Sequence, residues 1–77
     1  VSGYPNPTLS EATTSGWMPG STVRVFSATS GQLIHEARAN GSGQSRLPAQ
    51  LWASGLYKVT GWNTTGASDQ WTLEVLK

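Results

Sequence analysis

The chain has 77 residues, carries five Lys or Arg against four Asp or Glu, and contains no cysteine. A net charge of +1 provides no basic surface of the kind that binds nucleic acid or an anionic membrane. The missing cysteines exclude disulfides and thiolate sites, and no apolar run approaches the roughly 18 residues of a membrane-spanning helix. Folding a chain of this size buries only about 60% of the surface that the unfolded chain exposes, so the core must be thin.

Short runs of alternating polar and apolar residues, separated by turn residues, predict β-strands along the chain. Several short strands at this spacing are typical of a β-sandwich or barrel. The predicted strands are, in chain order, Leu9–Thr13, Thr22–Ser27, Gln32–Arg38, Ser45–Leu47, Leu56–Trp62 and Gln70–Leu76, and a seventh is possible.

The last two predicted strands can be aligned residue by residue if their turn is centred on Gly66. The alignment gives one apolar and one mostly polar face, and it pairs Lys58 with Glu74 on the polar side. It also sets Gly61 opposite Trp71, where the missing Cβ makes room for the indole. The apolar face is predicted to hold three cross-strand pairs, Tyr57 with Val75, Val59 with Leu73, and Gly61 with Trp71.

The second and third predicted strands form an earlier hairpin whose register is less defined. Arg24 and Glu36 are expected on its outer face, and two registers that differ by two residues remain open. The inner face is predicted to hold Val23, Val25, Leu33, His35 and Ala37.

Residues that carry chemistry are scarce. His35 and Asp69 are the only histidine and the only aspartate, and no Gly-x-Ser-x-Gly elbow presents a nucleophile beside them. The sequence holds neither a metal-ligand cluster nor a Gly-rich nucleotide loop. We therefore predict that the chain is not an enzyme and that it holds no cofactor or metal.

The four tryptophans are expected to divide between core and surface. Trp71 belongs to the apolar face of the last hairpin, and Trp17 is expected to close one end of the core. Two interpretations remain open for Trp52 and Trp62. They either cover strand edges or a second small cluster, or they stack on sugar rings, as in a small carbohydrate-binding β-sandwich module.

Four motifs occur in one order along nearly the whole chain. The first is Tyr4-Pro5-Asn6-Pro7, the second is VRVFSATSGQLI at residues 23–34, and the third is LWASGLYKV at residues 51–59. The last is the closing strand WTLEVLK, which ends in Lys77. In this order they resemble the type A C-terminal sorting domain of cargo exported by type IX secretion. Ser27 and Gln32 depart from the Asp and Arg that are usual in that family. The residues that carry the resemblance are Tyr4, Pro5, Asn6, Pro7, Val25, Phe26, Gly31, Ile34, Gly55, Tyr57, Val59, Leu73, Val75, Leu76 and Lys77.

The resemblance implies an Ig-like antiparallel β-sandwich of about seven short strands in two sheets, with residues 1–77 as one domain at the C-terminus of a larger exported protein. That the chain begins with Val1 fits the expectation of a longer parent. The implied role is that of a non-catalytic C-terminal sorting signal, which directs the attached cargo across the outer membrane. The implied partners are the type IX outer-membrane translocon with its shuttle and sortase components, without nucleic acid or membrane insertion.

The implied route leads through the periplasm of a Gram-negative cell to the outer membrane, the cell surface or the medium, with possible sortase removal and attachment of the cargo to lipopolysaccharide. The prolines of the first motif lack N–H groups, so we expect an extended segment. It either caps the first strand and separates it from an upstream linker, or is only a stiff lead-in to that strand. A partner could read the outer residues Thr72, Glu74 and Leu76 of the last strand, the terminal carboxylate at Lys77, or the backbone edge of that strand if it is unpaired. Such an edge could also drive self-association. The predicted recognition residues are Tyr4, Pro5, Asn6, Pro7, Gly55, Tyr57, Val59, Thr72, Glu74, Val75, Leu76 and Lys77.

Overall fold

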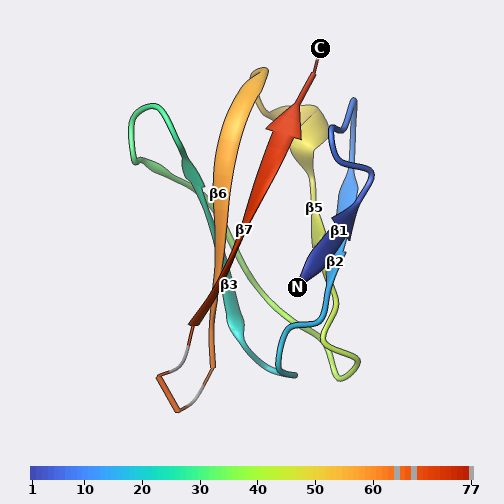
Figure 1. Cartoon of the computed structure of the whole chain (residues 1–77), viewed down its shortest axis with the longest axis vertical. Helices are drawn as coiled ribbons and strands as arrows, with labels where there is room; N and C mark the ends of the chain where they lie inside the picture. The colour runs from blue at the N-terminus through green and yellow to red at the C-terminus, as the bar shows by residue number, and fades with distance from the viewer. Residues whose placement is uncertain (64, 67, 77) are drawn as a thin grey trace.

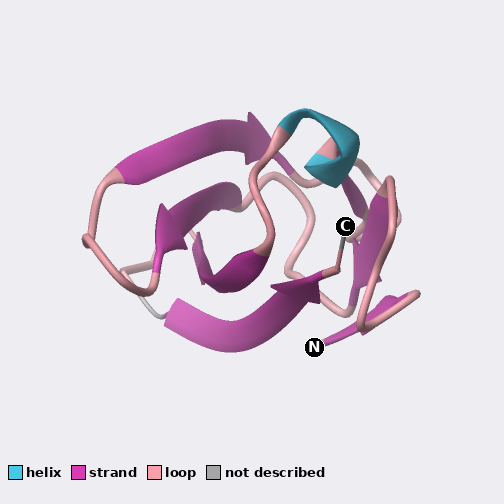
Figure 2. Cartoon of the chain, turned by 90° about the horizontal axis from the view of Figure 1, so that it is seen from above, coloured by secondary structure: helices cyan, strands magenta, loops and turns pink. Residues whose placement is uncertain are grey.

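The molecule consists of two β-sheets packed face to face. Its structure is a computed structural model, which describes residues 1–63, 65–66 and 68–76. The two curved layers are seen in Figure 1 and, along the strands, in Figure 2. The smaller sheet has the order β1-β2-β5, and the larger has the order β4-β3-β6-β7. The predicted Ig-like sandwich of about seven strands is therefore confirmed. The elements are β1 (Ser2–Tyr4), β2 (Ala12–Ser15), β3 (Thr22–Ser27), β4 (Leu33–Arg38), β5 (Ser45–Leu47), the 3-10 helix η1 (Ala49–Leu51), β6 (Gly55–Trp62) and β7 (Ser68–Val75).

The N-terminal part of the chain differs from the prediction. The first strand is β1, which pairs antiparallel with β2 and already includes Tyr4. The prolines therefore follow the first strand and do not lead into it. Leu9 lies outside any strand and is exposed, and β2 begins only at Ala12. A strand as short as Ser2–Tyr4 shows too little alternation to be recognised from sequence.

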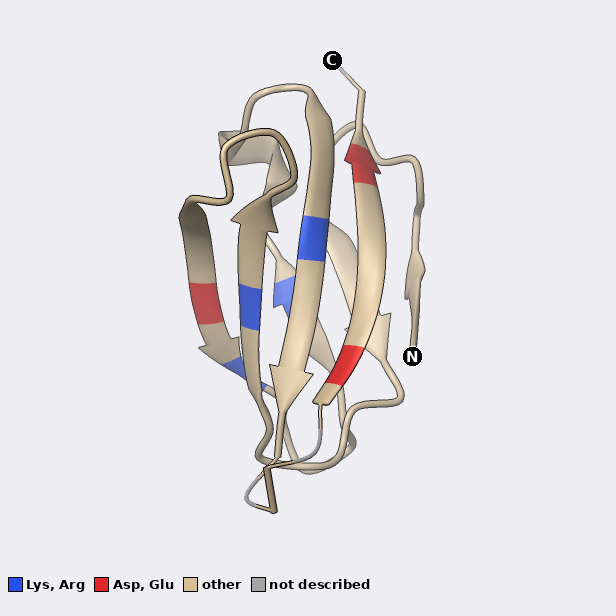
Figure 3. Cartoon of the chain, turned by 60° about the vertical axis from the view of Figure 1, so that its left-hand side comes forward, with Lys and Arg blue, Asp and Glu red and all other residues tan. Residues whose placement is uncertain are grey.

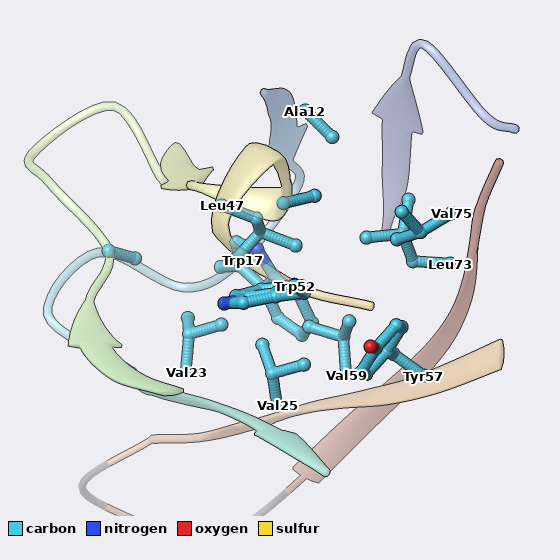
Figure 4. Close-up of a cluster of buried hydrophobic side chains, with 12 residues drawn as sticks. Ala12, Trp17, Val23, Val25, Leu47, Trp52, Tyr57, Val59, Leu73 and Val75 are labelled. Atoms are coloured by element: carbon cyan, nitrogen blue, oxygen red, sulfur yellow. The ribbon is translucent and has the colours of Figure 1, made fainter. Parts of the chain in front are cut away.

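The core lies between the sheets and contains two of the four tryptophans (Figure 4). Trp17 and Trp52 are both at least nine-tenths buried. The indole Nε1 of Trp17 donates to the Thr14 hydroxyl at 2.8 Å, and that hydroxyl donates to the Ser45 carbonyl at 2.8 Å. This relay satisfies the buried indole N–H of Trp17 and the buried hydroxyl of Thr14, as a dry interior requires. The buried apolar residues are Ala12, Trp17, Val23, Val25, Ala39, Leu47, Ala49, Trp52, Tyr57, Val59, Leu73 and Val75.

The register of the β6–β7 hairpin is shifted by two residues from the predicted one. Tyr57 lies opposite Leu73, and Lys58 lies opposite Thr72 and not Glu74. The loop between Trp62 and Ser68 is centred on residue 65, one position before Gly66, which moves each partner by two. A shift of two residues leaves every side chain on its predicted face, because side chains alternate with a period of two.

The predicted contact of a glycine with an indole exists, but with other partners. Gly61 faces Asp69 across the hairpin and lies directly beneath the indole ring of Trp17. The ring of Trp71, which is half-buried against the core, instead covers Gly3 of β1. Each of these two glycines thus lets a large ring of a distant segment approach the backbone.

The β3–β4 hairpin adopts one of the two registers left open. Arg24 lies opposite Glu36, and their side chains form an ion pair at 2.6 Å on the outer face. A β-bulge then shifts the pairing and brings Leu33 opposite Phe26. The expectation that Leu33 lines the inner face is wrong, since it is 47% exposed. Bulges of this kind twist an edge strand such as β4 and disfavour edge-to-edge pairing.

We predict that Gly61→Ala destabilises the domain, because the added Cβ would overlap the six-membered ring of Trp17. Overpacking of this kind costs roughly 1–3 kcal/mol of the free energy of unfolding. For a domain of this size the melting temperature should fall by about 4–8 °C per kcal/mol. Gly41→Ala is the matched control, because no atom lies near its added Cβ, and an equal effect of both changes on melting would contradict the contact.

Candidate functional site

Residues 4–8, which we call the front segment, cross from the smaller sheet to the outer edge of β7. Tyr4 ends β1 in the smaller sheet. Two residues later, the side chain of Asn6 makes two hydrogen bonds to the main chain of β7. Its Nδ2 donates to the Thr72 carbonyl at 3.0 Å, and its Oδ1 accepts from the Glu74 amide at 3.0 Å. The front segment therefore joins the two sheets near the C-terminal end of β7 (Figure 1).

Thr8 continues the same pairing with its main chain. Its N–H donates to the Glu74 carbonyl, and its carbonyl accepts from the Leu76 amide, both at 2.8 Å. The pair Thr8 and Val75 forms a parallel bridge. Asn6 and Thr8 together thus occupy four main-chain groups along the edge of β7, from the Thr72 carbonyl to the Leu76 amide.

The two prolines explain why Asn6 uses its side chain. Proline has no N–H to donate to a strand, so Pro5 and Pro7 cannot extend a ladder. The side-chain amide of asparagine carries the same donor and acceptor as a peptide group, and in Asn6 it takes the position that a paired residue would hold. Both bonds that precede these prolines are cis, and the segment is bent where an extended course was expected.

The last strand does not present an unpaired edge between Thr72 and Leu76, because the front segment covers it. What this stretch offers to solvent is side chains. Thr72, Glu74 and Leu76 are exposed, whereas Val75 is buried. Lys77 lies outside the described residues.

Thr8 is the one residue of this arrangement that the sequence did not single out. It is fully buried, and its hydroxyl accepts from the Ser10 amide at 3.2 Å and faces the carbonyls of Ser10 and Glu11 at 3.1 and 3.3 Å. These bonds turn the chain back toward β2. Threonine hydroxyls often make such turns with the residue two positions on, which is the signal that the sequence offered.

The motif around Gly55 builds the core rather than the surface. Tyr57 and Val59 are buried. The Tyr57 hydroxyl donates to the Ala53 carbonyl at 2.5 Å, and its ring lies 5.2 Å from the Trp52 rings, measured between centroids. Gly55 begins β6 with a φ of +147°, a conformation that favours glycine. Of these predicted recognition residues, Tyr57 and Val59 do not reach the surface that a partner would touch.

Exposed leucines lie at the end of the sandwich where β7 ends. Leu51 closes η1, and Leu56 lies near the start of β6, opposite Glu74. Figure 1 shows η1 and the C-terminus at this same end. Together with the exposed ring of Tyr4, they give this end of the molecule an apolar character. The leucines are Leu9, Leu51, Leu56 and Leu76, which are each at least 45% exposed.

Trp52 and Trp62 lie on opposite faces of the larger sheet. Trp52 follows η1 and is buried in the core beside His35 and Tyr57. Trp62 ends β6 on the outer face and is 45% exposed. One sugar-binding surface cannot use both indoles.

The two residues considered for catalysis are far apart. His35 lies on β4 and Asp69 on β7, which are the opposite edges of the four-stranded sheet. Three strand spacings separate them, about 14 Å at roughly 4.8 Å each. Within residues 1–63, 65–66 and 68–76, no three His, Asp or Glu side chains gather closely enough to hold a metal ion.

Comparison of the chain with protein-family models, with curated proteins and with solved structures finds no match. In the part of the chain that the structure describes, no helix has the length and apolar character to cross a membrane. The candidate site is defined by geometry alone. It is the surface that the front segment and β7, which are distant in sequence, form together.

We predict that Asn6→Ala opens the edge of β7. Loss of the two hydrogen bonds should lower the free energy of unfolding by about 1–3 kcal/mol, since each contributes roughly 0.5–1.5 kcal/mol. The Glu74 amide loses its acceptor, so its hydrogen exchange should accelerate in NMR measurements, more than that of amides within the β3–β6 ladder.

Asn6→Asp is the matched control. It keeps an acceptor for the Glu74 amide but has no donor for the Thr72 carbonyl, so Glu74 should remain protected. An unchanged exchange rate of Glu74 in Asn6→Ala would show that this side chain does not seal the edge.

Proposed function

We propose that the domain is a sorting signal of type IX secretion, which directs an attached cargo across the outer membrane. The observation that carries this proposal is the contact of Asn6 and Thr8 with residues 72–76. The first and the last motif of the family resemblance thereby lie side by side. A translocon that accepts many cargos needs a feature that is independent of the cargo, and a surface that only the folded domain assembles supplies one.

The partner-facing surface in this proposal consists of exposed side chains from both motifs. Tyr4 is 81% exposed, and Leu76 is 45% exposed. Thr72 and Glu74 extend this surface along β7. Exposed apolar residues rimmed by polar ones are a common feature of protein interaction sites.

A covered strand edge changes the mode of recognition that the proposal requires. A partner that adds a strand to residues 72–76 would first have to displace Asn6 and Thr8. We therefore favour a partner that reads side chains at this end of the folded domain. The proposed partners remain the outer-membrane translocon and its shuttle and sortase components, and the proposed route remains the periplasm followed by the cell surface or the medium.

We predict that Leu76→Asp prevents surface display of a reporter. The reporter carries an export signal at its N-terminus and residues 1–77 at its C-terminus, in a host with a type IX apparatus. A carboxylate placed in an apolar contact loses its hydration without gaining a partner. Surface display should fall roughly tenfold or more, the effect of about 1.4 kcal/mol of lost contact energy, and the reporter should accumulate in the periplasm.

Leu33→Asp is the matched control, because Leu33 is a leucine of similar exposure, 47%, on the opposite edge strand. Its reporter should reach the surface normally, and both variants should melt within a few degrees of the wild type. Equal display of the two variants would contradict the proposed surface. A wild-type domain that fails to display the reporter would contradict the sorting function itself.

A further inference from the structure

Trp62 lies on the outer face of the larger sheet, where it has no role in the core. It is the most exposed of the four tryptophans, at 45%. A hollow lies on each side of it. The larger, of about 430 Å³, is lined by Phe26, Lys58 and Thr60 together with the β3–β4 turn. The smaller, of about 210 Å³, is lined by Arg24 and Arg38 among others. We call the two hollows with Trp62 between them the outer groove.

Thr60 in the larger hollow is an unusual residue for an outer sheet face. It is 92% buried, and its hydroxyl has no hydrogen-bond partner among the described residues. Burying a hydroxyl without a partner is unfavourable. Thr60 lines the larger hollow, so a small shift of a neighbouring side chain would bring its hydroxyl within reach of a ligand. A polar ligand would then supply the missing hydrogen bond.

The charge of the outer groove is positive. Lys58 and Arg38 have no carboxylate partner within the described residues, and Arg24 pairs with Glu36. Figure 3 shows the four strands of this sheet with their few charged positions. No acidic residue among those described lines either hollow, and Glu74, which shares this face of the sheet, lies opposite Leu56. Lys58 and Arg38 can therefore pair with a ligand anion.

These features identify the chemistry of a ligand. An exposed indole offers a flat apolar surface with a polar edge. Alternate residues of β6 place Lys58, Thr60 and Trp62 in one row about 13 Å long, at roughly 3.3 Å per residue. The larger hollow has the volume of a small-molecule site. A pyranose ring has an apolar face for the indole and hydroxyls for Thr60, and a uronic acid adds a carboxylate for Lys58 or Arg38.

We propose that the outer groove binds an acidic polysaccharide built of uronic acids. A sugar ring lies against Trp62, its hydroxyls reach Thr60, and its carboxylates pair with Lys58 and Arg38. The groove is on the larger sheet's outer face and uses none of the residues proposed for sorting. The site is thus independent of that function.

The test is titration of the 77-residue domain with hexagalacturonate, followed by tryptophan fluorescence and by chemical-shift mapping of the backbone amides. Binding should shift the emission of Trp62 and perturb amides of β3 and β6 around the groove. Trp62→Ala should raise the Kd about tenfold or more, which corresponds to roughly 1.4 kcal/mol. Lys58→Gln should raise it several-fold, with a weaker dependence on salt.

Leu56→Ala is the matched control, because Leu56 is an exposed apolar residue on the same strand and the same face but does not line the groove. Its Kd should equal that of the wild type. Cellohexaose tests the need for charge, and hexaglutamate tests the need for a sugar ring. Equal binding of either compound, an unchanged Kd in Trp62→Ala, shift changes confined to other surfaces, or no binding of hexagalacturonate would each overturn the proposal.

Discussion

The side chain of Asn6, standing in for a backbone at the edge of β7, is the contact on which the arrangement of this domain depends. A sheet edge presents unpaired main-chain groups that invite pairing with another chain. Here the chain supplies its own cover, and it does so with a segment whose prolines cannot form a ladder. Asn6 provides both the donor and the acceptor in one side chain, and Thr8 completes the row. The same contact ties the smaller sheet to the larger.

The thin core is filled by large rings placed against the smallest residues. Trp17 covers Gly61 of the larger sheet, and Trp71 covers Gly3 of the smaller one. Each pair joins segments that are distant in sequence. Because the chain has no cysteine and so no disulfide, packing contacts of this kind hold the two layers together. They also explain why the register of β6 and β7 is fixed, although the alternation of polar and apolar residues allows shifts of two.

Much of the fold could be predicted from the sequence, since alternation and turn residues are local signals. They predicted the fold class, the position of β3, β5 and most of β6, and the faces of the last hairpin. They could not distinguish the true register from one two residues away, since both place Val59 and Leu73 inside. β1 was missed because three residues carry no period. Trp52 could not be assigned, because the turn of η1 that directs it into the core is itself irregular.

The candidate site was harder to predict than the fold. The motif with Asn6 was recognised, but its bonds to β7 span 66 and 68 residues, and no local pattern contains such a contact. Sequence also gave no means of separating motif residues that build the core from those that face solvent. Tyr57 and Val75 belong to the first group, and Tyr4 and Leu76 to the second. The distinction narrows the surface available to a partner.

The span between Asn6 and Glu74 has a consequence for the order in which the chain is made and folded. Asn6 leaves the ribosome well before β7, the strand that receives its side chain, because 66 and 68 residues separate the bonded partners. The front of the domain therefore has no native docking place until β7 has emerged, and long-range closure of this kind is slow.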